Sequence, residues 1–248
     1  MPLNYEKWDL SLKDYMEMIF FAAGVGFASG YLFYDSIAVG TGIAFLTAAL
    51  KPRYIASKIE KRRKILLLQF RDLLYSISSS LSVGRSMSQA LEESIDFWQG
   101  VYSPEDFIMV ELSYMVRKIR EGNESDVNVL EDFASRSGLT DVWDFVNVYK
   151  NCRSSGGNMI LAVNRAASII GDKIMLEKEL ESLMAQKRFE GRIVMLAPFA
   201  IMLFLKIVSP EYLKPLNASS KGMIIATAAL ALICTALYMT ERINRIEV

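Results

Sequence analysis

The chain contains no histidine, so it lacks the commonest general base and the commonest nitrogen ligand for zinc. Its only cysteines are Cys152, in a polar stretch, and Cys234, in an apolar run. We expect no disulfide between them, and lone thiols fit a reducing compartment for the polar part. The 28 basic residues balance the 28 acidic ones, so no overall field attracts nucleic acid. These absences predict no metal site, no cofactor and no nucleic-acid partner.

Motifs for catalysis are missing as well. There is no phosphate-binding Gly-Lys-Ser or Gly-Lys-Thr, no GxSxG, no CxxC and no HExxH. The serines between Ser76 and Ser82 have no partner base, and small side chains of this kind let two helices pack closely. Acids such as Asp126 and Glu131 are expected on exposed faces rather than in a cleft. We therefore expect that the protein is not an enzyme.

Long apolar runs occur near both ends of the chain, whereas its middle is highly charged. Each run, with its flanks, approaches the roughly 20 residues that a helix needs to cross a membrane. A signal peptide is excluded, because the first run is too long and the segment before it is not basic. The expected organisation is an N-terminal segment with a membrane hairpin in residues 1–54 (spans 15–34 and 36–54), a helical domain in 55–192, a second hairpin in 193–240 (spans 193–212 and 222–240), and a tail in 241–248.

Basic residues follow the first hairpin, from Lys58 to Lys64, and precede the second at Lys187 and Arg188. By the positive-inside rule the central domain and both termini are cytoplasmic, in a protein of the inner membrane. Lys206, near the end of the third span, either extends its amine to the headgroups or is a functional intramembrane charge.

The first span carries a GxxxG pattern at Gly26 and Gly30. Small residues at this spacing let helix backbones approach closely. Two alternatives remain open, packing within the hairpin and packing against a second membrane protein.

The central segment predicts about six helices and no strand, which is enough for one compact bundle. The apolar residues between Leu66 and Leu81 lie on one face at helical spacing. Gly84 is expected to end that helix, and Ser86 to Gln89 have the form of a capping box that starts the next.

A helix start is also expected at Ser103-Pro104, and Trp143 and Tyr149 are expected to face inward. The helix after Gly157 has no stop signal and is expected to continue into the third span. The predicted fold class is an all-α membrane protein with one cytoplasmic helical bundle flanked by two transmembrane hairpins.

Acidic residues dominate the middle of this domain, between Glu92 and Asp144. They form either a solvated face or a docking surface for a basic cytoplasmic partner. The candidate docking residues are Glu92, Glu93, Asp96, Glu105, Asp106, Glu131 and Asp132.

Three motifs follow one another along the domain. Residues 70–91 read FRDLLYSISSSLSVGRSMSQAL, residues 119–122 read IREG, and residues 153–159 read RSSGGNM. In this order, between two hairpins, they resemble the type II secretion system F domain, over about residues 62–198. The motif positions are Gly84, Ala90, Gly122, Gly156 and Gly157.

A single F domain between two hairpins is similar to the TadB/TadC branch of tight-adherence (Flp) pilus assembly proteins. The longer GspF/PilC members carry two F domains, and a glutamate commonly stands shortly before their Ser-Gly turn. Arg153 occupies that neighbourhood here. This departure favours the Tad branch and argues against a carboxylate metal site.

The resemblance implies an inner-membrane platform that couples a cytoplasmic secretion ATPase to pilin extraction and filament assembly. The implied partners are the secretion ATPase, pilin subunits, a sibling F-domain membrane protein and the lipid membrane, in a hetero- or homo-oligomer. Two other classes remain open from the sequence. One is a transporter or permease subunit, and the other is a membrane-tethered regulatory bundle.

Overall fold

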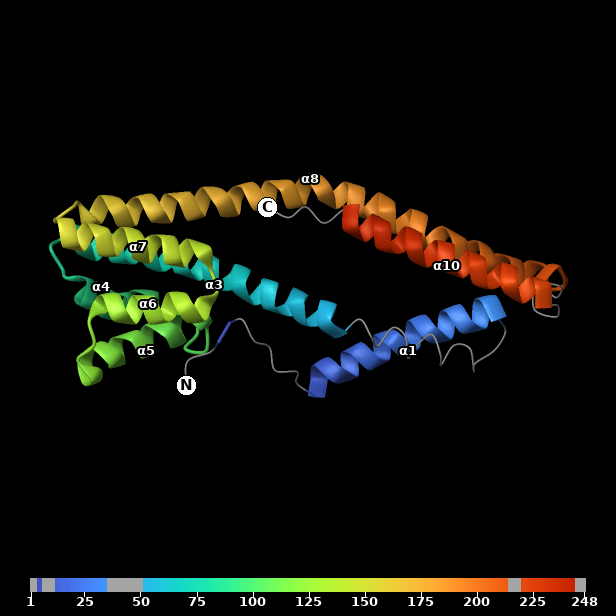
Figure 1. The fold of residues 1–248 in the computed structure, drawn as a ribbon, viewed down its shortest axis with the longest axis horizontal. Coiled ribbons are helices and arrows are strands. Elements are labelled where there is room, and N and C mark those ends of the chain that lie inside the picture. Colours follow the sequence, from blue (N-terminus) through green and yellow to red (C-terminus); the bar gives the residue numbers. More distant parts are fainter. Residues whose placement is uncertain (1–3, 6–11, 35–50, 214–219, 244–248) are drawn as a thin grey trace. The chain divides into compact units, whose positions relative to one another are not determined.

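The computed structural model describes residues 4–5, 12–34, 51–213 and 220–243 of the 248-residue chain. Apart from an isolated bridge between Gln99 and Tyr102, the regular structure in these residues is helical, so the predicted all-α class is confirmed (Figure 1). The helices are α1 (Leu12–Tyr34), α3 (Lys51–Ser82), α4 (Met87–Trp98), α5 (Phe107–Gly122), α6 (Asp126–Ser137), α7 (Thr140–Ser155), α8 (Met159–Val208) and α10 (Ser220–Ile243).

The chain divides into two compact units. The bundle unit comprises Met1–Asp9 and Ile55–Leu176, and the apolar unit comprises Leu10–Tyr54 and Glu177–Val248. In the bundle unit, α4 to α7 lie beside α3 and the first part of α8 (Figure 1), which agrees with the prediction of about six helices. Helices α3 and α8 each contribute residues to both units.

The core of the bundle unit forms around α3. Leu66, Phe70 and Leu73 are almost completely buried, and the same holds for Leu74 and Ile77 further along this helix. The ring of Phe70 lies 5.7 Å from that of Phe133 on α6 and 5.6 Å from that of Phe145 on α7, measured between centroids. The apolar stripe that helical spacing predicts on α3 is therefore confirmed, and it joins α6 and α7 in one core.

The serine-rich end of α3 lies against α4. The hydroxyls of Ser76 and Ser94 are 2.8 Å apart, and both residues are buried. The indole N–H of Trp98 donates to the Ser76 hydroxyl at 3.1 Å. Small hydroxyl side chains thus allow close packing here, and the buried hydroxyls of Ser76 and Ser94 are both hydrogen-bonded.

Helix ends follow their local signals at most positions. Ser86 and Gln89 form a complete capping box at the start of α4. Gly84 (φ 86°) follows the end of α3, and Gly156 (φ 69°) follows the end of α7. Both adopt the left-handed backbone conformation, which glycine accepts without strain. At the end of α5 the left-handed residue is Asn123 (φ 48°) rather than the motif glycine Gly122.

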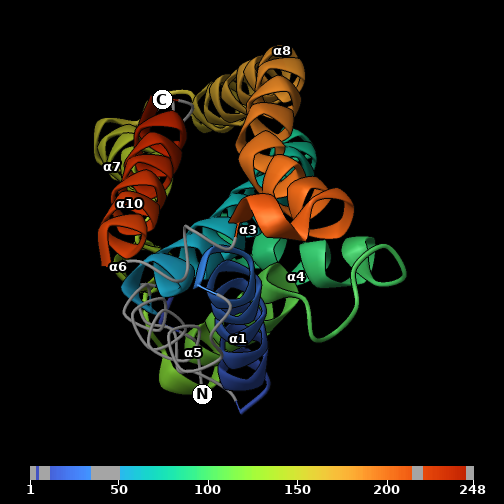
Figure 2. The ribbon, with the colours of Figure 1, turned by 90° about the vertical axis from the view of Figure 1, so that its right-hand side faces the viewer.

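Two local predictions were wrong. Helix α5 begins at Phe107 rather than at Pro104, because the Asp106 carboxylate accepts the Ser103 N–H at 2.7 Å and closes a separate turn. Figure 2 shows the connection between α4 and α5 looping outward at the edge of the bundle. Trp143 is exposed rather than buried, and the core positions of α7 are occupied instead by Val142 and Phe145.

In the apolar unit α1 packs against α10, where the Tyr34 hydroxyl donates to Thr227 Oγ1 at 2.9 Å. Gly26 and Gly30 are both buried, which supports packing of the GxxxG face within the chain. The Lys206 amine donates to the carbonyl oxygen of Tyr31 and lies 3.5 Å from the centroid of its ring. The charge of Lys206 is therefore held against α1.

Among the described residues, one helix, α8, is long and apolar enough to cross a membrane, and α10 carries a shorter apolar stretch at Gly222–Ile233. As predicted, α8 continues without interruption past Pro198 to Val208. Most of the expected second span, residues 36–50, lies outside the described residues, as does most of the expected tail.

Candidate docking surfaces on the helical bundle

The acidic candidates do not form one continuous acidic face. Helix α5 packs against both α4 and α6, and its basic residues lie between the acids of those two helices. Arg120 pairs with Glu92 on α4, and Lys118 lies 3.8 Å from Asp132 on α6. Part of the acidic charge is thereby neutralised within the domain.

Bases from outside the acidic segment neutralise two more of these acids. Arg85 pairs with Glu93 at 2.8 Å, and Lys150 pairs with Glu131 at 2.7 Å. Sequence reasoning missed these pairs, because their partners come from the α3–α4 connection and from α7, which only folding brings near. Among the described residues, Asp96 and Glu105 are the docking candidates whose side chains make no hydrogen bond or ion pair.

Next to these two acids, apolar side chains stand in solvent. Phe97 is 65% exposed and Val101 is 67% exposed, so both offer apolar surface to a partner. Their neighbours hold the segment in place. The Tyr102 hydroxyl donates to Asp72 on α3 at 2.5 Å, and the Trp98 indole donates to Ser76, also on α3. We name Asp96, Phe97, Val101 and Glu105 the α4–α5 patch.

A buried polar cluster ties the N-terminal peptide to the bundle. Tyr5 and Glu111 are completely buried, and the Tyr5 hydroxyl donates to the Glu111 carboxylate at 3.1 Å. Arg136 donates to both oxygens of that carboxylate, at 2.8 and 2.7 Å, and its carbonyl accepts the Tyr5 N–H at 3.0 Å. The ring of Tyr5 meets Phe107 edge-on, with centroids 5.7 Å apart.

Burial and the neighbouring Glu111 charge raise the pKa of Tyr5 well above its usual range. The tyrosine therefore stays neutral and keeps donating its proton to the carboxylate. The sequence offered no signal for this contact, because Tyr5 lies far from Glu111 along the chain and belongs to no periodic pattern.

A second buried carboxylate lies between α6 and α7. Asp126 was expected on an exposed face, but it is buried, and this expectation is corrected. It accepts the Tyr149 hydroxyl at 2.6 Å and pairs with Arg153 at the end of α7. Burial raises the pKa of Tyr149 to about 12. Arg153 thus has a structural role here, as partner of a buried acid.

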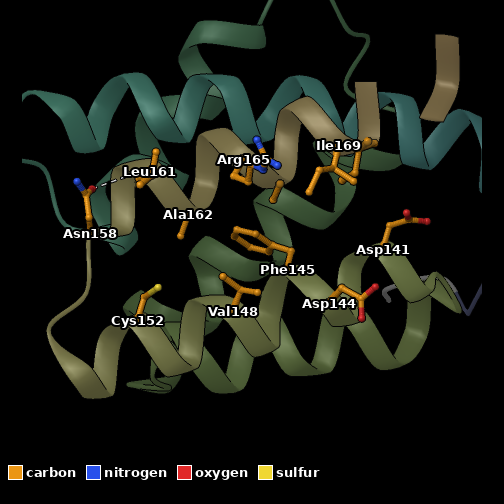
Figure 3. A pocket seen from close by; sticks show the side chains of 12 residues that line it. Asp141, Asp144, Phe145, Val148, Cys152, Asn158, Leu161, Ala162, Arg165 and Ile169 are labelled. Carbon is orange, nitrogen blue, oxygen red and sulfur yellow. Dashed lines mark hydrogen bonds between the residues drawn. The ribbon is translucent and has the colours of Figure 1, made fainter. Parts of the chain in front are cut away.

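An apolar groove runs between α7 and α8, with a volume of about 460 Å³ (Figure 3). Phe145, Val148 and Cys152 line it from α7, and Leu161, Arg165 and Ile169 line it from α8. At one end Lys173 pairs with Asp141 at 2.9 Å and joins the two helices.

The motif residues lie at helix ends and in the core. Ala90 is completely buried on α4. A Cβ at Gly157 would lie 3.4 Å from Cys152, which is ordinary van der Waals contact. Among the described residues, no three histidine, cysteine, aspartate or glutamate side chains are grouped so as to hold a metal ion. Comparison of the chain with models of known protein families, with curated proteins and with solved structures finds no match.

Proposed function

We propose that the chain is a TadB/TadC-like platform protein of a pilus assembly machine, related to the type II secretion system F domain. One observation carries the proposal: the first and last helices of the six-helix bundle, α3 and α8, do not end with it. Each continues as an unbroken helix into the apolar unit. An unbroken helix transmits a displacement along its axis, because its backbone hydrogen bonds resist stretching.

Membrane embedding by two hairpins is part of this proposal. Beyond residue 192, large apolar side chains of α8 such as Ile193, Val194 and Phe204 are exposed. A soluble protein rarely exposes so long an apolar surface, whereas lipid chains would cover it. Together with the apolar stretch of α10 and the apolar runs before residue 51, this supports two spans at each end of the chain.

The contact of Tyr5 with the bundle supports a cytoplasmic N-terminus. Tyr5 and the start of the bundle at Ile55 belong to the same unit. The chain between them must therefore return to the side from which it left, which requires an even number of crossings. This argument is independent of the basic flanks and agrees with the orientation that they predict.

The α4–α5 patch is the surface that we assign to the secretion ATPase. It combines an exposed aromatic anchor, Phe97, with the unpaired charges of Asp96 and Glu105. Interfaces gain most of their energy from such anchors, and surrounding charges speed the encounter and select the partner. In this proposal the ATPase displaces the bundle, α3 and α8 pass the displacement to the membrane segments, and pilin subunits leave the bilayer. The chain itself hydrolyses nothing.

In-cell photocrosslinking tests the proposal. A photoreactive amino acid at Phe97 should capture a secretion ATPase, whereas the same group at Val83, which is even more exposed, should not. The double variant Asp96→Lys, Glu105→Lys should lose the capture by at least about tenfold, because it reverses the attraction to a basic partner. Capture of a solute carrier or a signalling protein instead, or pili that persist after deletion of the gene, would contradict the proposal.

A further inference from the structure

The groove between α7 and α8 leaves apolar side chains uncovered along both of its walls. Val148 on α7 is 45% exposed, and Leu161 and Ile169 on α8 are 65% and 53% exposed. Phe145 forms part of the floor and is itself buried in the core, so the groove lies on a well-packed part of the bundle. Its walls are held together by the pair of Asp141 with Lys173.

Two charges in this groove lack a partner among the described residues. Asp144 lines the wall formed by α7, and Arg165 lines the wall formed by α8 (Figure 3). Neither side chain makes an ion pair or a hydrogen bond within the described residues, whereas Asp141, Lys150 and Arg153 nearby are all paired. One wall thus presents a free acid and the opposite wall a free base, with apolar surface around both.

We propose that this groove is a self-association surface whose occupant is the same groove of a second copy of the chain. A two-fold interface brings one patch against itself, so that residue i meets residue j of the partner and residue j meets residue i. The patch must therefore be self-complementary. A groove with one acid and one base on opposite walls meets this requirement, because a two-fold axis between them brings Asp144 of each copy to Arg165 of the other. In this arrangement the second copy covers the apolar side chains of Val148, Leu161 and Ile169 in each groove.

The proposal does not depend on a role in pilus assembly. It concerns a face of the bundle separate in sequence from the α4–α5 patch, and the two surfaces use different residues. The rival explanation is that Asp144 and Arg165 pair with each other within one chain in solution. Charge reversal in mixed copies separates the two explanations.

The experiment uses two differently tagged copies of the full chain, co-expressed and purified in detergent through one tag. The variant Asp144→Arg places two positive charges in each groove, and Arg165→Asp places two negative charges there. Each variant alone should co-purify its own second copy at least about tenfold less than the unmodified chain does, because like charges meet across the axis. A mixture of the two variants should restore co-purification to within about threefold of the unmodified level, because opposite charges meet again.

A matched control reverses an exposed pair within one chain. The variants Glu131→Lys and Lys150→Glu, alone or mixed, should leave co-purification unchanged, since this pair joins α6 and α7 of the same copy. Circular dichroism and thermal melting show that each variant keeps its helices. The proposal is overturned if unmodified copies do not co-purify, if the two single reversals have no effect, or if folded variants fail to restore each other in the mixture.

Discussion

The pair of Glu111 with Arg136 allows a quantitative test of the bundle. The Glu111 side chain is completely buried and the Arg136 side chain is 15% exposed, so the carboxylate has almost no access to water. It accepts two hydrogen bonds from Arg136 and one from Tyr5. The variant Arg136→Met retains much of the aliphatic stem and removes the charge, which leaves the carboxylate with the tyrosine hydroxyl as its main donor.

Loss of one partner of a buried ion pair costs about 3–5 kcal/mol, because the remaining charge stays desolvated. The contacts of Arg136 with Asp132 at 3.1 Å and with the Tyr114 ring at 5.1 Å disappear too. These two contacts are partly exposed, so their loss adds at most about 1 kcal/mol to the destabilisation. The double variant Arg136→Met, Glu111→Gln removes the buried charge itself and should cost only about 1–2 kcal/mol. The double variant should therefore be more stable than Arg136→Met alone, by about 1–4 kcal/mol.

Urea unfolding of the full chain in detergent, followed by tryptophan fluorescence, measures these free energies, because Trp98 and Trp143 both belong to the bundle unit. The control Lys150→Met breaks the exposed pair with Glu131 and should cost less than about 1 kcal/mol. A cost below about 1 kcal/mol for Arg136→Met, or a double variant no more stable than the single one, would refute the assignment of Glu111 as a buried charge held by Arg136.

Three further predictions concern Tyr5, Tyr149 and Gly156. Tyr5→Ala should expose the N-terminal peptide to protease added to inverted membrane vesicles. The variant Tyr5→Phe keeps the ring against Phe107, so its N-terminal peptide should stay protected. Equal cleavage of both variants would show that the ring contact does not hold the peptide. The pKa of Tyr149 is about 12 in the folded protein and about 10 when unfolded, so its contribution to stability is complete below pH 10 and is lost as the pH rises toward 12. Tyr149→Phe should therefore lower stability by about 1–2 kcal/mol at pH 7 but flatten its decline above pH 10 in urea titrations, and an unchanged alkaline slope would count against this. Gly156→Ala should lower the free energy of unfolding by about 1–2 kcal/mol in the same urea assay, because the φ of Gly156 is 69° and a side chain is strained there. An unchanged free energy would mean that the turn can rearrange.

Local patterns predicted the helices well where the signal lies in neighbouring residues. The stripe from Leu66 to Ile77, the capping box at Ser86 and the glycine at position 84 all act within a few turns of one helix, so the structure reproduces them. The prediction failed at Ser103, where a cap-like sequence closes a turn through Asp106 instead. The same residue types serve both purposes, and only the packing of the following helix decides between them.

The charged surface was much harder to predict. Within the segment from Glu92 to Asp144 acids outnumber bases, but Arg85, Lys150 and Arg153 come from outside it and pair with three of these acids. Which acids remain unpaired depends on how helices cross, and composition holds no information on that. The candidate docking surface is therefore smaller than the acidic segment and is centred on Phe97. No hydrophobic periodicity in the sequence indicated that Phe97 would be exposed.

The sequence by itself determined that the chain is helical, that its apolar residues lie toward the ends and its charges in the middle, and where most helices begin and end. These properties follow from spacing and propensity over a few residues, which act before distant segments meet. Only the tertiary structure decided that Tyr5 seals a buried carboxylate, that Asp126 is internal, and that α7 and α8 enclose a groove with one free acid and one free base. Each of these joins residues from separate elements, and their contact is set by the packing of whole helices rather than by any local pattern.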